Sequence, residues 1–409
     1  MINNKRIFVV VTLLYIIYTV FPLFADIFSI PVWLPSIATV LVIVLLFPSA
    51  FKNRLFYWFL VYAAVLTVNL LMGRDLTIGI GTVDDEKKIF IEFAYILPAI
   101  AIFCVLYYLK DDQVNRRIAV WSIVILYLSF IVAVPLMLRY NSLREALSIE
   151  GREMIHIAGL PGYSLMHSYT FFLPVMCYAT KTMKGWKKIL SIIGIIVLSF
   201  VIYDTFVTTS LIVGIAIIFV SLIYKGGDTT VFWFTGGFLL LVIYTLYLFG
   251  LFISLIDWMM PAFEDTPVES KLLDFRASMV ENTLTGGTIE GRLDLHRKSW
   301  DSFMQNPLLG MGASNVGNHS SLLDRFGGMG FIAGFPFVMI FVSFIKRMVK
   351  MYETKTAKVF FWIGTICAFI FLYQKGNWGG EAWLIYMSLM PMGIKTFENK
   401  VLSDESRSS

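Results

Sequence analysis

Residues 189–224 read ILSIIGIIVLSFVIYDTFVTTSLIVGIAIIFVSLIY and contain a single charged residue, Asp204. A helix needs about 20 apolar residues to cross a bilayer, so this run is too long for one crossing and long enough for two short ones. A charged side chain is costly in the lipid interior and belongs at the surface. We therefore predict a tight turn at Asp204 that separates two membrane spans, over 188–203 and 207–224.

Comparable apolar runs recur along the whole chain of 409 residues, of which 58% are hydrophobic and 15% are charged. Soluble domains carry about a quarter charged residues, so this composition is typical of a membrane protein. The sequence predicts a single all-α integral membrane domain, 1–409, with about twelve transmembrane helices. The predicted spans are 6–24, 32–48, 55–72, 89–109, 118–138, 160–180, 188–203, 207–224, 231–254, 319–345, 357–373 and 380–395.

Basic residues indicate the orientation of these spans, because Lys and Arg gather in the cytoplasmic loops of membrane proteins. With the N-terminus in the cytoplasm, every loop predicted to be cytoplasmic is basic, as at 184–188 and 346–350. The first span is expected to be retained, since no small-residue cleavage pattern follows it. Both termini are therefore predicted to be cytoplasmic. The longer hydrophilic loops are predicted to be extracytoplasmic, namely 73–88, 139–159 and 255–318.

The largest loop, 255–318, is expected to contain short helices. Its part FEDTPVESKLLDFRASMVENTL, 263–284, has the pattern of an amphipathic helix. A second helix is predicted over RLDLHRKSWDSFM, 292–304, and Asn306-Pro307 ends it. The polar tail at 400–409 is predicted to be disordered and cytoplasmic.

Several kinds of site are not indicated by the sequence. The net charge is +5, but the basic residues sit in short loops between apolar runs, so no nucleic-acid partner is expected. Cys104, Cys177 and Cys367 each fall inside an apolar run without metal or redox spacing, which argues against a disulfide framework. The chain has no GxxxxGK[ST] and no HExxH motif. We expect no metal and no cofactor.

Arginines on the predicted outer face break the positive-inside pattern. Arg152 lies in the loop 139–159, and Arg276 and Arg292 lie in the large loop. Arg325 lies just inside the start of a predicted span. Arginine costs roughly 2.5–3.5 kcal/mol to insert at mid-membrane, so an arginine within a span is usually there for a reason. A guanidinium group binds phosphate oxygens bidentately, so these residues suit a lipid-linked diphosphate. The alternative for each is a surface ion pair, and for Arg325 it is snorkelling or pairing with Asp324.

All four histidines are expected on the outer side or at the outer end of a span: His156, His167, His296 and His319. His319 stands in GNHSSLLD, 317–324, between a glycine-rich turn and a predicted helix start. A neutral imidazole there can take a proton from an attacking hydroxyl. The alternative is that His319 or Ser320 caps the helix. His167, inside a span, is expected to pack or to hydrogen-bond.

The segment GRLDLHRKSWDSFMQNPLLGMGASNVGNHSSLLDRFGGMGFIAGFPFVMIF, 291–341, resembles the signature region of the O-antigen polymerase and O-antigen ligase superfamily. It has a Gly-Arg, a Pro-Leu-x-Gly-x-Gly, a His-Ser, a leucine pair and a Gly-x-x-Gly that enters a membrane helix, in that order. The run IHIAGLPGYSLMHSYTFFLPV, 155–175, is similar to the family's glycine-containing entry to a middle span. The large outer loop before a late span also fits.

The resemblance implies a metal-independent, inverting glycosyltransferase of the bacterial inner membrane, with its active site facing the periplasm or outside. Its substrate would be an undecaprenyl-diphosphate-linked oligosaccharide, and a chain-length regulator protein is a further partner that the family suggests. His319 and Arg292 match the family's catalytic residues, and Arg152 loosely matches its arginine before the middle span. The glycines would let the backbone approach the substrate closely.

Two positions depart from the family pattern. The aromatic position after Arg292 is occupied by His296, with Trp300 one turn later. The family often has an arginine at the outer start of the span that follows its tight turn, but here that region reads VTTSLIVG. If the diphosphate needs that arginine, Arg325 or Arg276 is expected to replace it.

Three other functions compete with the polymerase. An O-antigen ligase would share the fold and the donor and differ in the acceptor. A transporter or flippase of lipid-linked glycans would use Glu92 and Glu381, near the outer ends of spans, as proton or cation sites. No two-half repeat of the kind common in transporters is visible in the sequence. A membrane scaffold without catalysis is disfavoured by the clustering of arginine and histidine on one face.

Overall fold

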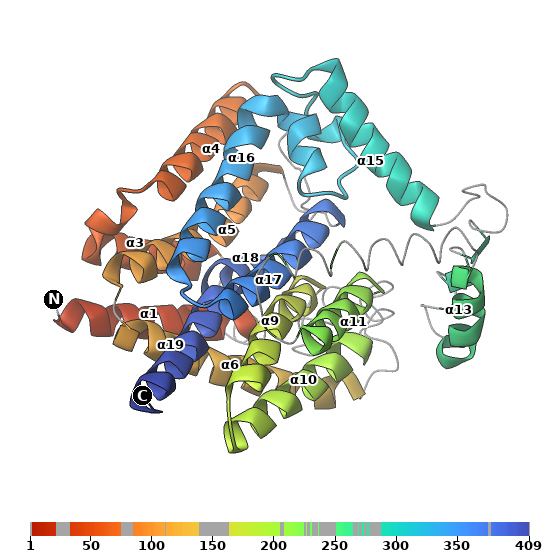
Figure 1. Cartoon of the computed structure of the whole chain (residues 1–409). Coiled ribbons are helices and arrows are strands. Elements are labelled where there is room, and N and C mark those ends of the chain that lie inside the picture. Colours follow the sequence, from red (N-terminus) through yellow and green to blue (C-terminus); the bar gives the residue numbers. More distant parts are fainter. Residues whose placement is uncertain are drawn as a thin grey trace.

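A computed structural model gives the fold. It describes residues 2–21, 33–74, 85–110, 112–138, 163–204, 208–224, 251–264, 288–374 and 378–408, with a few single positions between 226 and 277. Within these ranges the chain is helical and has no strand, which confirms the all-α prediction (Figure 1). The α-helices are α1 (Ile2–Val20), α3 (Trp33–Leu46), α4 (Arg54–Leu71), α5 (Asp85–Leu109), α6 (Asp112–Leu138), α9 (Tyr163–Thr182), α10 (Trp186–Asp204), α11 (Thr208–Ile223), α13 (Leu251–Met259), α15 (Thr288–Gln305), α16 (Leu323–Met351), α17 (Lys355–Gln374), α18 (Gly380–Leu384) and α19 (Met390–Ser408).

Four of the described helices are long and apolar enough to cross a membrane: α4, α10, α16 and α17. Shorter apolar helices accompany them at Trp33–Leu46, Phe93–Leu109 and Thr209–Ile223. Exposed leucine, isoleucine and aromatic side chains cover the outer sides of α3, α4, α10 and α11. The chain is therefore a helical membrane protein. The span predicted over 231–254 lies mostly outside the described residues.

The long apolar run that opens the sequence argument is divided into two helices, as predicted. Helix α10 ends at Asp204 and α11 begins at Thr208. Both pack against α9, so the divided run folds back onto a common neighbour. The residues between the two helices, 205–207, lie outside the described part of the chain.

The large loop and the C-terminal tail are described in part. The helix predicted over 292–304 is confirmed as α15, which ends just before Asn306. The amphipathic helix predicted over 263–284 falls mostly outside the described residues, as do the loop 139–159 and most of the loop 73–88. The end of the latter loop, 85–88, is the first turn of α5. Helix α19 continues to Ser408, so helical structure extends well into the segment 400–409 for which the sequence predicts disorder.

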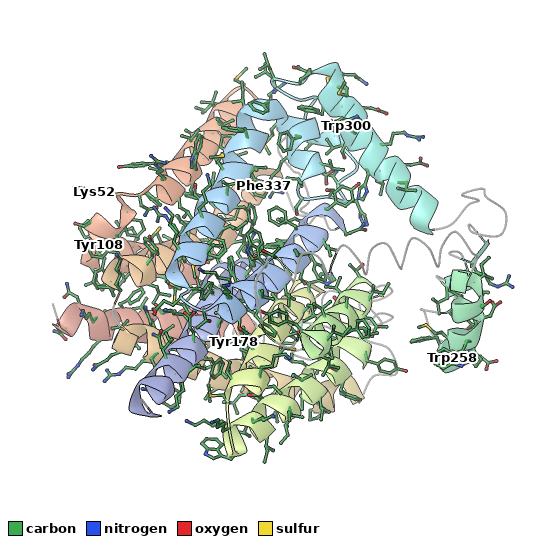
Figure 2. The ribbon with its side chains drawn as sticks, viewed as in Figure 1. Lys52, Tyr108, Tyr178, Trp258, Trp300 and Phe337 are labelled. Carbon is green, nitrogen blue, oxygen red and sulfur yellow. The ribbon has the colours of Figure 1, made fainter. Side chains whose placement is uncertain are left out.

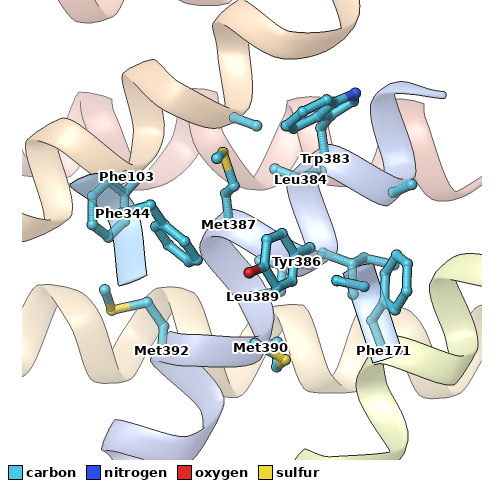
Figure 3. Close-up of a cluster of buried hydrophobic side chains, with 14 of the residues drawn as sticks. Phe103, Phe171, Phe344, Trp383, Leu384, Tyr386, Met387, Leu389, Met390 and Met392 are labelled. Carbon is cyan, nitrogen blue, oxygen red and sulfur yellow. The ribbon is translucent and has the colours of Figure 1, made fainter. Parts of the chain in front are cut away.

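Buried aromatic, leucine and methionine side chains form a hydrophobic cluster inside the bundle (Figure 3). One uninterrupted helical run crosses it from Gly380 to Ser408, with a buried π-helical segment, η4 (Ile385–Leu389), between α18 and α19. The Tyr386 ring lies 5.2 Å from Phe344, and Trp383 lies 5.2 Å from Phe341. These contacts join the middle of α16 to the C-terminal helices. The candidate site lies elsewhere on α16, where its first turns pack against α15.

Candidate functional site

Helix α15 packs against the beginning of α16 through small polar side chains. Ser299 on α15 donates its hydroxyl to a carboxylate oxygen of Asp324 at 2.5 Å, and accepts the backbone N–H of Gly317 at 2.9 Å. One turn further along, the Ser302 hydroxyl donates to the carbonyl of Asn315. Serine has a short side chain, so the backbones of α15 and the loop 306–322 approach each other closely.

The start of α16 is capped by two reciprocal hydrogen bonds. The Ser320 hydroxyl accepts the backbone N–H of Leu323 at 3.1 Å, and the Asp324 carboxylate accepts the backbone N–H of Ser320 at 2.8 Å. This is the logic of a capping box, in which each partner satisfies a backbone donor that the helix leaves open. Ser320 thus accepts a backbone donor of the first turn of α16, although the N-cap position itself is Leu322, which makes no side-chain cap. Asp324 itself is fully buried.

Helix α16 is interrupted at Gly330, whose backbone has φ 66° and ψ −168°. The loop 307–312 forms backbone hydrogen bonds with the interrupted part of α16, 327–332. These bonds satisfy N–H and C=O groups that the break in the helix leaves without helical partners. Such satisfaction is required for irregular backbone at membrane depth. The hydrogen bonds run from Met311 N to Gly327 O at 2.8 Å, Gly312 N to Gly328 O at 2.9 Å, Phe331 N to Pro307 O at 2.7 Å and Ile332 N to Leu308 O at 3.2 Å.

The glycines of this region serve that backbone pairing. A Cβ on Gly310 would collide with the backbone of Gly328, and a Cβ on Gly330 would collide with that of Leu308. A Cβ on Gly327 would likewise meet the backbone of Ser299. These positions are close to the protein's own chain, so the expectation that the glycines make room for a substrate is replaced by an internal packing role.

Arg74, at the end of α4, fastens the loop and was missed by the sequence reasoning. Its guanidinium donates to the carbonyls of Leu309 at 2.6 Å and Gly310 at 3.1 Å, and to the Asn69 side chain at 3.2 Å. Gly73, with φ 70°, turns the chain just before it. The sequence did show an arginine directly after a predicted span. It could not show what that arginine binds, because Leu309 and Gly310 lie 235 and 236 residues further along the chain.

Two of the four histidines come together beside this loop. His319 is half-buried, and its ring centre lies 6.3 Å from that of His296, which is buried on α15. The His296 ring also lies 4.9 Å from Tyr373, near the end of α17. The Asp324 carboxylate is within electrostatic reach of His296. The sequence singled out both imidazoles but did not predict that they would meet.

Arg325 points into the protein. Its side chain is only 6% exposed and lies between α16 and α4. The Nε atom donates to the Tyr62 hydroxyl at 2.9 Å, and Nη1 donates to the carbonyl of Ser321. The guanidinium carbon stands 4.3 Å above the Phe337 ring, whose interior position is labelled in Figure 2. Arg325 is thus held by a hydroxyl, a carbonyl and an aromatic face, and it lies within electrostatic reach of Asp324.

The other predicted arginines are placed less completely. Arg276 forms an ion pair with Asp257 on α13, with 2.6 Å between Nε and the carboxylate, and both side chains are partly exposed. The hydrogen bond from Arg276 to Asp257 raises the pKa of its guanidinium, which therefore stays charged. Arg292 belongs to α15, but its side chain lies outside the described part of the structure. Arg152 lies outside the described residues altogether.

Two of the remaining candidates, His167 and Glu381, are described by the structure. His167 Nδ1 lies 2.6 Å from the Ser210 hydroxyl, and its ring lies 4.6 Å from Phe371, which confirms the packing and hydrogen-bonding role. Glu381 occupies the first turn of α18. His156 and the side chain of Glu92 lie outside the described part of the chain.

The residues His296, Ser299, His319, Asp324 and Arg325 are called the α15–α16 cluster below. It combines two imidazoles with a buried carboxylate and a buried guanidinium, so it offers a proton acceptor and fixed charge of both signs. Among the described residues, no group of three or more His, Cys, Asp or Glu side chains is placed to hold a metal ion. No protein-family model and no curated protein matches the chain.

Proposed function

We propose that the chain is a glycosyltransferase that joins lipid-diphosphate-linked oligosaccharide units, as a surface-polysaccharide polymerase. The observation that carries the proposal is the meeting of His319 and His296, whose ring centres lie 6.3 Å apart, with the Asp324 carboxylate within electrostatic reach of His296. All three residues belong to the segment that resembles the O-antigen polymerase and ligase superfamily. The interrupted helix α16 contributes by holding this segment in place, because its broken turn pairs with the loop 307–312 that precedes His319.

The proposed topology has about twelve spans, both termini in the cytoplasm and the α15–α16 cluster on the outer side of a bacterial inner membrane. The basic loops support this orientation through the positive-inside rule. The end of α4 and the start of α16 meet at the loop 306–322, which is consistent with one face of the membrane for both. On that face a glycan carried on undecaprenyl diphosphate would reach the cluster.

In the proposed reaction a hydroxyl of the acceptor sugar attacks the anomeric carbon of the donor. The new carbon–oxygen bond forms as the bond to the diphosphate breaks, and the diphosphate leaves with the electron pair. His319 takes the hydroxyl proton, a contribution worth about 10²–10⁴-fold in rate. Arg292 stabilises the negative charge on the leaving diphosphate, with Arg152 and Arg276 as further candidates.

Arg325 has a different part in this proposal from the one its position in the sequence indicated. It is buried between Tyr62 and Phe337, so within the cluster it supplies a fixed, buried positive charge rather than an exposed fork for the diphosphate. Arg297 and Lys298 are exposed on α15 and offer cations at the surface of the same helix. The diphosphate is therefore expected to approach α15 from its exposed side.

The test is chain growth by purified protein in liposomes that contain a lipid-diphosphate-linked repeat unit. The wild type is expected to extend the glycan, and folded His319→Ala is expected to lose at least about 100-fold in rate. Lys184→Ala, at an exposed position between α9 and α10, serves as the matched control and should keep the wild-type rate. Transfer only to an added lipid A core would indicate a ligase. Movement of the lipid-linked glycan across the bilayer without a new glycosidic bond would contradict the proposal in favour of transport.

A further inference from the structure

Helix α15 has three distinct sides. The side that faces α16 and the loop carries His296, Ser299 and Ser302, all buried. With about 100° per residue in an α-helix, Leu293, Trp300 and Met304 fall within an arc of roughly 40° on a second side. Trp300 and Met304 are 51% and 58% exposed there. The third side carries the exposed charges Asp294, Arg297, Lys298 and Asp301.

The apolar side of α15 continues into the loop that follows it. Leu308 and Leu309 are exposed directly after the helix, and the backbone of Leu308 is bonded to Ile332 of α16. Ile332 is itself exposed, together with Phe331 and Phe335 on the same helix. We call Leu293, Trp300, Met304, Leu308 and Leu309 the apolar strip; Figure 2 labels Trp300 on α15.

The strip also joins the outer surface of α4, one of the helices long and apolar enough to cross a membrane. Arg74 holds the carbonyls of Leu309 and Gly310 against the end of α4. Just before Arg74, Leu71 and Met72 are highly exposed. Exposed apolar residues therefore occur on α4, on α16 and on α15, and hydrogen bonds join the three elements at the loop that carries Leu308 and Leu309.

We propose that bilayer lipid covers the apolar strip, so that α15 lies in the membrane interface. A helix with one apolar side and an adjacent charged side is suited to that zone, and tryptophan is enriched there. The charged side then faces water and the lipid headgroups, while His296, Ser299 and Ser302 face the protein. The sequence placed 292–304 in an extracytoplasmic loop; the proposed location is on the same side but against the membrane.

One consequence rests on the proposed function. Because His296 belongs to α15, an interfacial helix would hold the α15–α16 cluster at the depth of the headgroups. The diphosphate of a lipid-linked glycan lies at that depth. The location of α15 does not itself depend on that function, so it is tested without measuring activity.

The experiment uses single cysteines labelled with the environment-sensitive fluorophore NBD in proteoliposomes. Trp300→Cys and Met304→Cys report on the strip, and Asp294→Cys and Asp301→Cys on the charged side of the same helix are the matched controls. The native Cys104, Cys177 and Cys367 are replaced by alanine. If that background fails to fold, the native cysteines are kept, because they are buried and an unmutated sample measures their labelling.

We expect labels at 300 and 304 to emit at shorter wavelength and to be quenched at least twofold more by doxyl-labelled phosphatidylcholine than labels at 294 and 301. Aqueous iodide should quench in the opposite order. Equal iodide quenching at all four positions would overturn the proposal and place the strip in water. Blue-shifted emission without lipid quenching, together with crosslinking of two chains through position 300, would overturn it in favour of a protein partner.

Discussion

At the scale of single residues, Asp324 shows how little freedom a buried carboxylate has in this protein. Its two oxygens accept from the Ser299 hydroxyl and the Ser320 backbone N–H, so each oxygen has a role. In Asp324→Asn one of these acceptors becomes a donor, which leaves a buried donor without an acceptor. We expect a loss of about 1–3 kcal/mol in stability, measured as a lower thermal midpoint in detergent. Asp301→Asn, at an exposed position of α15, should change the midpoint little.

Two glycine-to-alanine substitutions are expected to act in opposite directions. Gly330 has φ 66° and a Cβ there would collide with the backbone of Leu308, so Gly330→Ala should destabilise the protein strongly or prevent folding. Gly291 lies exposed in α15 with open space around it, so Gly291→Ala should stabilise by about 0.5–1 kcal/mol. Both are measured by thermal unfolding. Equal effects would contradict the assigned backbone at Gly330.

At the scale of elements, the interrupted helix α16 depends on Arg74, which lies three residues beyond the end of α4. Without the guanidinium of Arg74, the carbonyls of Leu309 and Gly310 lose their donors, and the loop 307–312 should open more often. In Arg74→Met, we expect the amides of Met311 and Gly312 to exchange hydrogen at least tenfold faster. Arg54→Met, at the exposed opposite end of α4, is the control. Unchanged exchange in Arg74→Met would mean that the glycine pairing alone holds the loop.

The same elements show which features the sequence could predict. The apolar run around Asp204 gave two helices because length and a single charge are local signals. α15 was predicted from its local pattern and from the stop at Asn306-Pro307. The interruption at Gly330 depends on backbone pairing with the distant loop 307–312, which no local pattern records. The inward turn of Arg325 depends on Tyr62, 263 residues away in the chain.

At the scale of the whole molecule, a buried carboxylate on the C-terminal helix α19 binds the segment between α16 and α17. Glu398 is fully buried and accepts the backbone N–H groups of Glu353 and Thr354 at 2.8 and 2.6 Å. Lys395 donates to Glu398 at 2.8 Å. The carboxylate thus joins α19 to the turn between α16 and α17. It accepts hydrogen bonds from two backbone N–H groups just before the first residue of α17.

Removal of this carboxylate should lower the stability of the whole protein. Glu398→Ala leaves two backbone donors and the Lys395 ammonium without their buried acceptor, so we expect a loss of several kcal/mol in the free energy of unfolding. Glu353→Ala removes a mostly exposed partner of Lys395 and should cost about 1 kcal/mol or less. Thermal unfolding of both variants in one detergent decides this. Similar midpoints would show that Glu398 does not join α19 to the bundle.

The predicted topology gives the last test, because it fixes the side of the membrane on which every loop lies. An even number of spans and a cytoplasmic N-terminus require a cytoplasmic C-terminus, which agrees with the basic residues Lys395 and Lys400 on α19. A green fluorescent protein fused after Ser409 should therefore fluoresce, and alkaline phosphatase fused there should be inactive. Phosphatase fused after Glu264, at the end of η2 (Met260–Phe263) in the large loop, should be active. The reverse pattern at Ser409 would mean either an odd number of spans or an N-terminus outside the cell, and either would contradict the predicted topology. If the number of spans after α15 is unchanged, that result would also place the basic turn between α16 and α17 outside. A basic turn outside would contradict the positive-inside rule, from which the orientation was derived.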